Sequence, residues 1–327
     1  MKHNSPAGDV VVSETVITKN EQTCRVLIGD CIESMRIMQD QSVHCCVTSP
    51  PYFGLRDYGV DGQIGLEQRA PHYVENLVSV FAEVHRVLRD DGVLFVNLGD
   101  TYAGFKDGKF PPQSQSNGNQ RSMPVSGAPH RSKQLLQLDG FKNKELMGIP
   151  WRFAFAMQDA GWYLRQDIIW SKPNYTPEKV RDRFVKSHEH IFLFTKKDRY
   201  WFDGDAVRVP SESGGSKLRS DVWVTPTSSF KGAHFATFPP DLIQPCILAG
   251  SPDGGVVFDP FGGSGTTAGV AMKHGRNAVL CELNAEYAEL IPARIDSIVD
   301  AKPKQEKQKA DQDPMRDSYT IDMFANL

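Results

Sequence analysis

The stretch VVFDPFGGSGTTAGVAMKHG, residues 256–275, decides the fold. An apolar run ends in Asp259, a loop of glycine and serine follows, and a helix-forming segment begins at Thr266. Glycine lets the backbone pass close to a ligand, and a helix N-terminus offers unpaired N–H groups to an anion. A second apolar run, NAVLCE at 277–282, ends in Glu282. The stretch therefore predicts a strand, turn, helix and strand with a ligand site at the carboxyl ends of the strands.

The residues of this turn indicate which ligand it would hold. A phosphate loop needs a lysine that GGSGTT lacks, and a dinucleotide fingerprint needs a third glycine where this chain has Ala268. Asp259 would repel phosphate and would suit a cationic group. S-adenosylmethionine fits, with its sulfonium and ammonium near acids, its carboxylate at the helix N-terminus and its ribose at Glu282. The alternative is a glycine-rich turn with a purely structural role.

A second turn follows another apolar run, in HCCVTSPPYFGLRDYG at 44–59. Two consecutive prolines exclude a helix there, so the Ser49 hydroxyl and the Pro50 carbonyl stay at the carboxyl end of the strand. Tyr52 adds a flat aromatic face. Together these groups suit a planar ring that carries an NH₂ group. Taken alone the motif is weak, because proline-rich turns with an aromatic residue are common.

The rest of the chain alternates between apolar runs and segments with helical spacing. We expect strands at 43–47, 93–98, 162–170, 190–195, 256–258 and 278–281. We expect helices at 77–88, 151–160, 241–249, 266–273 and 285–298. This alternation predicts an α/β fold, a Rossmann-like and mostly parallel sheet with helices on both faces.

TSPPY followed later by DPFGGSGTT resembles the beta-type amino-methyltransferase family of DNA-modifying enzymes. In that arrangement the catalytic motif precedes the cofactor motif, with the target-recognition region between them. The resemblance covers about 27–298. It implies an S-adenosylmethionine-dependent methyltransferase sheet with an inserted target-recognition region. The implied activity is site-specific methylation of the exocyclic amine of a flipped DNA base, as in restriction–modification systems.

Which amine is modified stays open at this point. In the family, a tetrad that begins with serine, as Ser49 does here, favours N4 of cytosine, and one that begins with aspartate favours N6 of adenine. Serine and aspartate can both accept a hydrogen bond from NH₂. We therefore favour cytosine N4 and keep adenine N6 as the alternative.

The resemblance also implies site residues. The catalytic residues would be Ser49, Pro50, Pro51 and Tyr52, with hydrogen bonds from the amine to the Ser49 hydroxyl and the Pro50 carbonyl. Gly29-Asp30 resembles the segment that contacts the cofactor adenine, and HFATFPPDLI at 234–243 resembles the segment that closes over the cofactor. The implied cofactor-binding residues are Asp30, Phe235, Ala236, Phe238, Asp259, Phe261, Gly263, Ser264, Gly265, Thr266 and Glu282. No metal ligand is assigned. The assignment requires Ser49 and Gly263 to meet in one site.

We divide the chain into a polar N-terminal tail at 1–20, a methyltransferase domain at 21–300 and a flexible C-terminal tail at 301–327. Within the domain we expect a catalytic half at 21–170, a target-recognition region at about 103–147 and 173–232, and a cofactor half at 233–300. Residues 102–231 carry 21 Lys and Arg against 13 Asp and Glu, a net charge of +8, whereas the rest of the chain carries −11. A basic middle fits a surface that binds a polyanion, although charge also fluctuates along chains without function. The resemblance implies that this partner is double-stranded DNA.

Three other functions are weighed against this one. Methylation of a ring carbon would use Pro245-Cys246, but this pair precedes the glycine loop in the reverse of the usual order, so we expect Cys246 in the core. RNA or protein amine methyltransferases use similar tetrads, but the roughly 200 residues between the two motifs leave room to read DNA. A DNA-binding module with a dead cofactor site would not need both motifs intact.

The remaining expectations concern partners and location. YTIDMF at 319–324 loosely resembles the bacterial sliding-clamp-binding pentapeptide, with Thr320 where glutamine is usual; the alternative is a tail that packs on its own domain. No apolar run approaches the roughly 20 residues of a membrane helix, and no signal peptide is recognised, so we expect a cytoplasmic protein without membrane contact. The recognition sequence and the oligomeric state, a homodimer among the options, are not predicted.

Overall fold

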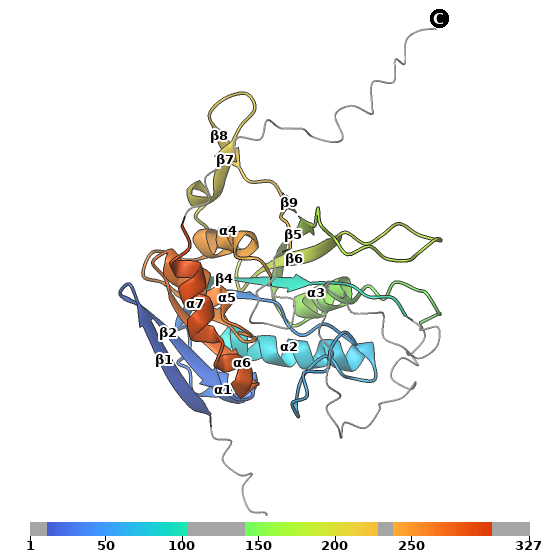
Figure 1. Ribbon diagram of the computed structural model, residues 1–327, viewed down its shortest axis with the longest axis horizontal. Coiled ribbons are helices and arrows are strands. Elements are labelled where there is room, and N and C mark those ends of the chain that lie inside the picture. The colour runs from blue at the N-terminus through green and yellow to red at the C-terminus, as the bar shows by residue number, and fades with distance from the viewer. Residues whose placement is uncertain (1–11, 104–140, 228–237, 303–327) are drawn as a thin grey trace, which may run out of the picture.

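The computed structural model describes residues 12–103, 141–227 and 238–302 (Figure 1). These residues form one nine-stranded sheet and one two-stranded ribbon. In spatial order the strands of the large sheet are β1 (Ser13–Lys19), β2 (Gln22–Ile28), β11 (Asn277–Glu282), β10 (Val256–Asp259), β3 (Val43–Thr48), β4 (Leu88–Leu98), β6 (His188–Thr195), β5 (Tyr163–Ser171) and β9 (Val222–Val224).

The centre of this sheet is parallel. Strands β2, β11, β10, β3 and β4 pair in parallel, and so do β5 and β9. The antiparallel pairs are β1 with β2, β4 with β6 and β5 with β6. The expected Rossmann-like, mostly parallel sheet is therefore confirmed. All its parallel central strands deliver their carboxyl ends to one edge, where ligands bind in open α/β sheets.

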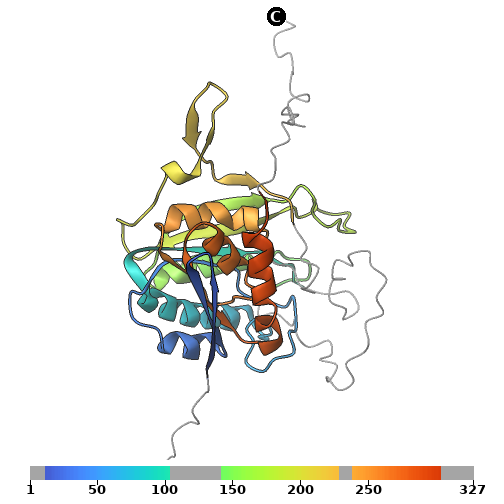
Figure 2. The ribbon, with the colours of Figure 1, turned by 60° about the vertical axis from the view of Figure 1, so that its left-hand side comes forward.

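Helices cover both faces of the sheet (Figures 1 and 2). On one face lie α1 (Cys31–Arg36), α2 (Ala70–Val87) and α3 (Ile149–Asp159). On the other lie α4 (Pro240–Gly250), α5 (Thr266–Lys273) and α7 (Ile291–Val299). Tyr73, Leu77, Phe81 and Val84 recur at helical spacing along α2 and are fully buried, which explains why this long helix docks against the sheet. Each face thus has its own apolar core.

Smaller elements complete the described fold. The short helix α6 (Ala285–Ala288) precedes α7. A 3-10 turn, η1 (Asp205–Val207), leads into the ribbon of β7 (Arg208–Pro210) and β8 (Ser216–Leu218). Figure 1 shows this ribbon projecting away from the sheet and its helices.

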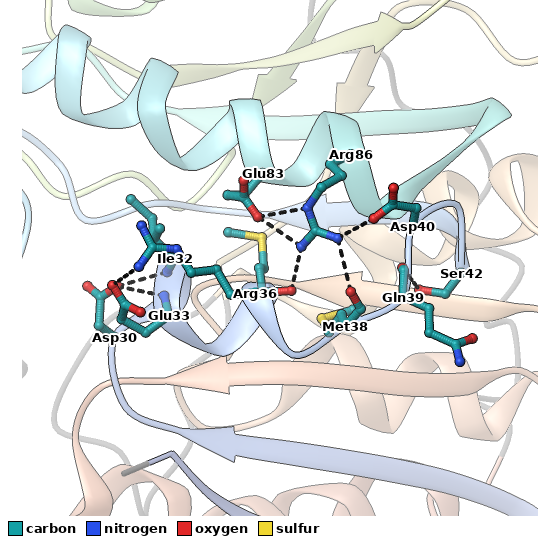
Figure 3. Close-up of polar contacts among 11 residues, drawn as sticks. Asp30, Ile32, Glu33, Arg36, Met38, Gln39, Asp40, Ser42, Glu83 and Arg86 are labelled. Carbon is teal, nitrogen blue, oxygen red and sulfur yellow. Dashed lines mark hydrogen bonds and ion pairs between the residues drawn. The ribbon is translucent and has the colours of Figure 1, made fainter. Parts of the chain in front are cut away.

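Arg86 links α2 to the carboxyl end of α1 on one face of the sheet (Figure 3). Its guanidinium donates from α2 to the carbonyls of Met35 and Met38, at 2.6 and 3.0 Å, just where α1 ends. It also binds the carboxylates of Asp40 and Glu83. The Met35 carbonyl lies in the last turn of α1 and the Met38 carbonyl lies two residues beyond its end, so this side chain joins both to α2. The segment that begins at Asp30 is thereby fixed against α2.

Three expectations from the sequence need correction. The polar tail expected at 1–20 contains the edge strand β1, which pairs along its whole length with β2 and is polar because it lies exposed at the edge. Lys19 also binds Asp296 and Asp300 on and beside α7. The helix expected at 285–298 is divided into α6 and α7, with Pro292 near the start of α7, where a proline is tolerated. The strand expected at 93–98 already begins at Leu88, directly after α2.

Several expected segments fall partly outside the described residues. They are most of the C-terminal tail with the clamp-like peptide 319–324, and the stretches 104–140 and 228–237 of the target-recognition and cofactor regions. Within the described ranges, no helix has the length and apolar character required to cross a membrane.

Candidate active site

The proline turn and the glycine turn meet at the carboxyl edge of the sheet. The proline turn follows β3 and the glycine turn follows β10, and these two strands are neighbours in the sheet. Both turns line one cavity of about 300 Å³: Ser49, Pro50 and Tyr52 come from the proline turn, and Gly263 and Ser264 come from the glycine turn. The requirement that Ser49 and Gly263 share a site is met.

Most of the residues named from the sequence line this cavity. They are Asp30, Ser49, Pro50, Pro51, Tyr52, Phe238, Asp259, Phe261, Gly263, Ser264, Thr266 and Glu282. Gly265 is the residue before α5 and has a φ of +90°, and a β-carbon there would come within 2.8 Å of the Ile291 side chain. Only glycine fits that bend without moving α7. Phe235 and Ala236 lie outside the described residues.

Asp259 joins the two turns. Its carboxylate accepts hydrogen bonds from the Thr48 hydroxyl at 2.6 Å, from the Thr267 hydroxyl at 2.7 Å and from the Phe261 N–H at 3.0 Å. Burial raises the pKa of Asp259 to about 6, although all three donors favour the charged form. Asp259 was expected to face a cationic ligand, and the structure gives its oxygens protein donors that hold β3, β10 and α5 together.

Glu282 supports the glycine turn from the end of β11. Its carboxylate accepts from the Gly263 N–H at 2.7 Å and from the Asn284 N–H at 2.8 Å. Burial raises the pKa of Glu282 to about 7, against the effect of these donors. A carboxylate has about four acceptor positions, so the Glu282 side chain can still accept from a ligand hydroxyl. Because the residue lines the cavity, it suits a ligand that carries hydroxyl groups.

Ser264 adds a polar group without a protein partner. The residue is only 1% exposed, and among the described residues no atom forms a hydrogen bond with its hydroxyl. A buried hydroxyl that lacks a partner is costly, so such groups usually meet a ligand or water. This half of the cavity therefore fits a polar cofactor.

Asp30 also lines this cavity, and Figure 3 shows it at the start of α1. Its Oδ1 accepts from the Ile32 and Glu33 N–H groups, at 2.9 and 3.1 Å, and so caps α1. The preceding Gly29 donates its N–H to the Glu282 carbonyl at 2.9 Å, which ties the ends of β2 and β11 together. Asp30 and Glu282 thus flank the same part of the cavity.

Aromatic and polar side chains from other elements hold the proline turn in place. The Tyr73 hydroxyl donates to the Pro51 carbonyl at 2.8 Å. The Tyr52 hydroxyl lies 2.6 Å from a Glu189 oxygen and 3.2 Å from the Asn97 amide oxygen. A β-carbon at Gly99 would come within 2.8 Å of the Tyr52 ring, so glycine leaves space for the ring there. The orientation of Tyr52 is fixed from several sides.

A partly buried ion pair adjoins the Tyr52 hydroxyl. The Lys172 ammonium binds Glu189, and the two side chains are 17% and 13% exposed. Burial alone would raise the pKa of Glu189, but Lys172 and the donors on Tyr52 and Asn97 hold it below its usual value. Burial and the neighbouring Glu189 charge raise the pKa of Tyr52 well above its ordinary range, so its hydroxyl stays protonated. Lys172 also lies 4.2 Å from the centre of the Trp170 ring.

The sequence did not identify Tyr73, Asn97 or Glu189 as site residues. Asn97 interrupts the apolar run at 93–98 of β4, whereas Glu189 stands between His188 and His190 at the start of β6. A polar residue in a buried strand needs a partner. That signal would have marked Asn97, but neither Glu189 nor the other residues that Asn97 contacts.

The cavity can therefore perform two tasks. The part lined by Asp30, Ser264 and Glu282 can hold a polar cofactor. The part lined by Ser49, Pro50 and Tyr52 can hold a planar ring with an amino group. Within the described part of the chain, no group of His, Cys, Asp and Glu side chains is arranged to hold a metal ion. Cys246 is buried in the core, as expected.

Comparison with known proteins agrees with this arrangement. The family model described as DNA methylase, N6_N4_Mtase, matches residues 43–292. The Type II methyltransferase M.XycI of Xanthomonas campestris pv. cyanopsidis is 49% identical over 267 residues, which cover 82% of this chain and 86% of the relative.

Two solved structures share the fold. The PvuII DNA methyltransferase, cytosine-N4-specific, matches with a TM-score of 0.59 and 20% identity, over 85% of this chain and 93% of that one. A candidate DNA modification methylase from Thermus thermophilus, TTHA0409, complexed with S-adenosyl-L-methionine, matches with a TM-score of 0.56 and 23% identity, over 84% and 95%.

Proposed function

Because the chain belongs to the DNA methylase family, whose model spans residues 43–292, we propose that it methylates N4 of cytosine in double-stranded DNA. The methyl donor is S-adenosylmethionine. The observation that carries this proposal is the shared cavity, where Ser49 and Pro50 face the glycine turn across the carboxyl edge of the sheet. Methylation of adenine N6 is the second candidate, since the same groups accept from either amine.

The cofactor half of the cavity fits S-adenosylmethionine. Glu282 would accept from the ribose hydroxyls, Asp30 would contact the adenine and the buried Ser264 hydroxyl would gain a partner. The other residues proposed to hold the cofactor are Phe235, Ala236, Phe238, Asp259, Phe261, Gly263, Gly265 and Thr266. When bound, the cofactor supplies an electrophilic methyl group on a sulfonium.

The chain's own residues would prepare the base for transfer. An exocyclic amine is a poor nucleophile, because its lone pair is delocalised into the ring. Hydrogen bonds from the NH₂ group to the Ser49 hydroxyl and the Pro50 carbonyl would favour a pyramidal nitrogen and fix its direction. Tyr52 would stack on the ring. Such positioning can contribute up to about 7–11 kcal/mol in the best cases.

The DNA must change shape to reach this cavity. A base inside a duplex cannot enter a site at the end of a sheet, so the target nucleotide would be flipped out. The loop between β5 and β6 spans residues 172–187. Lys172 at its start and Glu189, the second residue of β6, both line the cavity. This loop exposes Lys179 and Arg181, and Phe184 is 98% exposed. We assign this loop to contacts with the DNA backbone beside the target base.

The preference for cytosine rests on Ser49 as the first residue of the tetrad. The PvuII enzyme is cytosine-N4-specific, but its 20% identity to this chain supports the fold alone. M.XycI, at 49% identity, is a Type II methyltransferase, which supports a role in a restriction–modification system.

A labelling experiment tests the proposal. Duplex DNA is incubated with the protein and S-adenosylmethionine carrying a deuterated methyl group, then digested to nucleosides for mass spectrometry. We expect labelled N4-methylcytosine. Labelled N6-methyladenine would select the second candidate. Label on C5 of cytosine, or none on duplex DNA when an RNA or protein substrate accepts it, would contradict the proposal.

A further inference from the structure

Three side-chain oxygen atoms of cavity-lining residues form a connected row of polar contacts. The Tyr52 hydroxyl lies 2.6 Å from Oε2 of Glu189, and the Ser49 hydroxyl lies 3.5 Å from the Tyr52 oxygen. Glu189 belongs to β6 and is 137 residues away from Tyr52 in the chain. The row thus connects a buried carboxylate to the first residue of the tetrad.

The carboxylate at one end determines the direction of these hydrogen bonds. An ionised carboxylate can only accept, and a phenol has one proton to donate. That proton goes to Glu189 at 2.6 Å rather than to Asn97 at 3.2 Å, since a bond to a charged acceptor is shorter and stronger. The Tyr52 oxygen can then only accept from a further group. Its partner on the cavity side is the Ser49 hydroxyl.

The surroundings of Glu189 keep it ionised and in place. One oxygen binds the Lys172 ammonium, and the other also accepts from the Asn97 amide at 3.1 Å. The Asn97 amide is itself oriented by a second bond, to the His190 carbonyl at 3.1 Å. Asn97 lies on β4 and Lys172 directly follows β5, and these two strands flank β6 in the sheet. The donors that hold Glu189 therefore come from the elements on either side of its own strand.

We propose that Glu189 is a positioning residue that, through Tyr52, directs the Ser49 proton away from the base, so that Ser49 offers only lone pairs to the amine. This inference rests on the proposed function. A serine hydroxyl can donate as well as accept, and a donated bond would not prepare an amine for transfer. An aspartate in the first position would be an acceptor without this help. The row therefore restricts the Ser49 hydroxyl, which could otherwise donate or accept, to accepting from the amine.

The test compares single-turnover methylation by the wild type, Glu189→Gln and Tyr52→Phe. A glutamine amide can donate to Tyr52, and phenylalanine removes the phenol but keeps a ring for stacking. We expect each variant to lower the rate about 10- to 100-fold, while the KM for DNA and the Kd for S-adenosylmethionine change less than about twofold. The control Glu83→Gln makes the same chemical change in an ion pair with Arg86, outside the cavity, and should leave the rate unchanged.

The decisive arm repeats Glu189→Gln in a Ser49→Asp background and in a Ser49→Ala background. An aspartate accepts whatever its neighbours do, and an alanine has no proton to orient. In both backgrounds we expect Glu189→Gln to change the rate less than about threefold. A loss as large as in the wild type would show that Glu189 acts only through the fold and would overturn the inference. Failure of the wild type to methylate any base amine would instead contradict the proposed function.

Discussion

The hydroxyl of Thr48 donates a 2.6 Å hydrogen bond to Oδ1 of Asp259, and so joins the last residue of β3 to the last residue of β10. Each residue directly precedes one of the two turns that line the cavity. The separation between the tetrad and the glycine turn is therefore set by a buried contact between adjacent strands, not by the loops themselves.

Removing this contact should weaken the fold. Thr48→Val keeps the shape of the side chain but removes a donor from the buried Asp259 carboxyl. We expect the free energy of unfolding to fall by about 1–3 kcal/mol in urea titrations. Thr18→Val, on the exposed edge strand β1, is the matched control and should change it by less than about 0.5 kcal/mol. If both substitutions lowered the free energy of unfolding equally, the hydrogen bond from Thr48 to Asp259 would not contribute the stability assigned to it.

Ser49→Ala should separate binding from transfer. It removes one of the two proposed acceptors of the amine without touching the cofactor half of the cavity. We expect the single-turnover rate to fall about 100-fold, by analogy with the removal of one group that stabilises a transition state. Calorimetry should give a Kd for S-adenosylmethionine within about twofold of the wild type.

The control for this substitution is Ser79→Ala on α2, where the hydroxyl donates only to the Glu75 carbonyl of its own helix. This variant should methylate at the wild-type rate. If Ser49→Ala kept full activity, the role assigned to the tetrad serine would be wrong.

Cofactor binding should release a proton from Glu282. Its pKa of about 7, raised by burial, leaves much of the carboxyl protonated at pH 6.5, and ribose hydroxyls that donate to it favour the charged form. The affinity for S-adenosylmethionine should therefore rise between pH 6 and pH 7. The α-amino group of the cofactor does not interfere, because α-amino groups titrate at about 7.7–8.0. Calorimetry in buffers of different ionisation enthalpy measures the proton, and Glu282→Gln should abolish its release. An affinity independent of pH would contradict this assignment.

The same carboxyl also affects stability in a defined direction. Its ordinary pKa is 4.5, so between about pH 4.5 and pH 7 the folded chain binds more protons at Glu282 than the unfolded chain does. The contribution of this group to stability is therefore present below this window and falls as the pH rises through it. Thermal unfolding of Glu282→Gln without cofactor should lack this component of the pH dependence.

The loop between β5 and β6 should provide part of the salt-dependent affinity for DNA. Lys179→Ala and Arg181→Ala should each reduce the slope of log K against log salt by about 1, as expected for one phosphate contact. Fluorescence anisotropy with a labelled duplex measures this slope. Arg89→Ala, at the amino end of β4 and paired with Asp91, is the control and should leave the slope unchanged. If the slope stayed unchanged in all three variants, the loop between β5 and β6 would not contact the DNA backbone.

The two turns could be predicted from the sequence because their signals are local. Pro50 and Pro51 exclude a helix wherever they occur, and a strand that ends in Asp259 before glycines is complete within about ten residues. Their order along the chain then indicated a shared edge of the sheet. The sheet itself followed from the alternation of apolar runs and helical segments.

The support beneath the tetrad could not be predicted in the same way. Tyr52 and Glu189 meet only because β4 and β6 pair antiparallel and bring His190 and Leu98 opposite each other. No local pattern specifies that pairing. Strand β1 was missed for a different reason, since an exposed edge strand with polar side chains looks like a tail until its partner is known.

A crystal structure with S-adenosylmethionine and a duplex that contains the recognition sequence would test the central claim most directly. Sequencing of host DNA with and without the gene, with reads sensitive to modification, would supply that sequence. We predict an extruded base whose amine nitrogen lies within hydrogen-bond distance of the Ser49 hydroxyl and the Pro50 carbonyl, with the cofactor methyl group on the side of the glycine turn. A base that enters elsewhere, or a cofactor bound away from Ser264 and Glu282, would contradict the account.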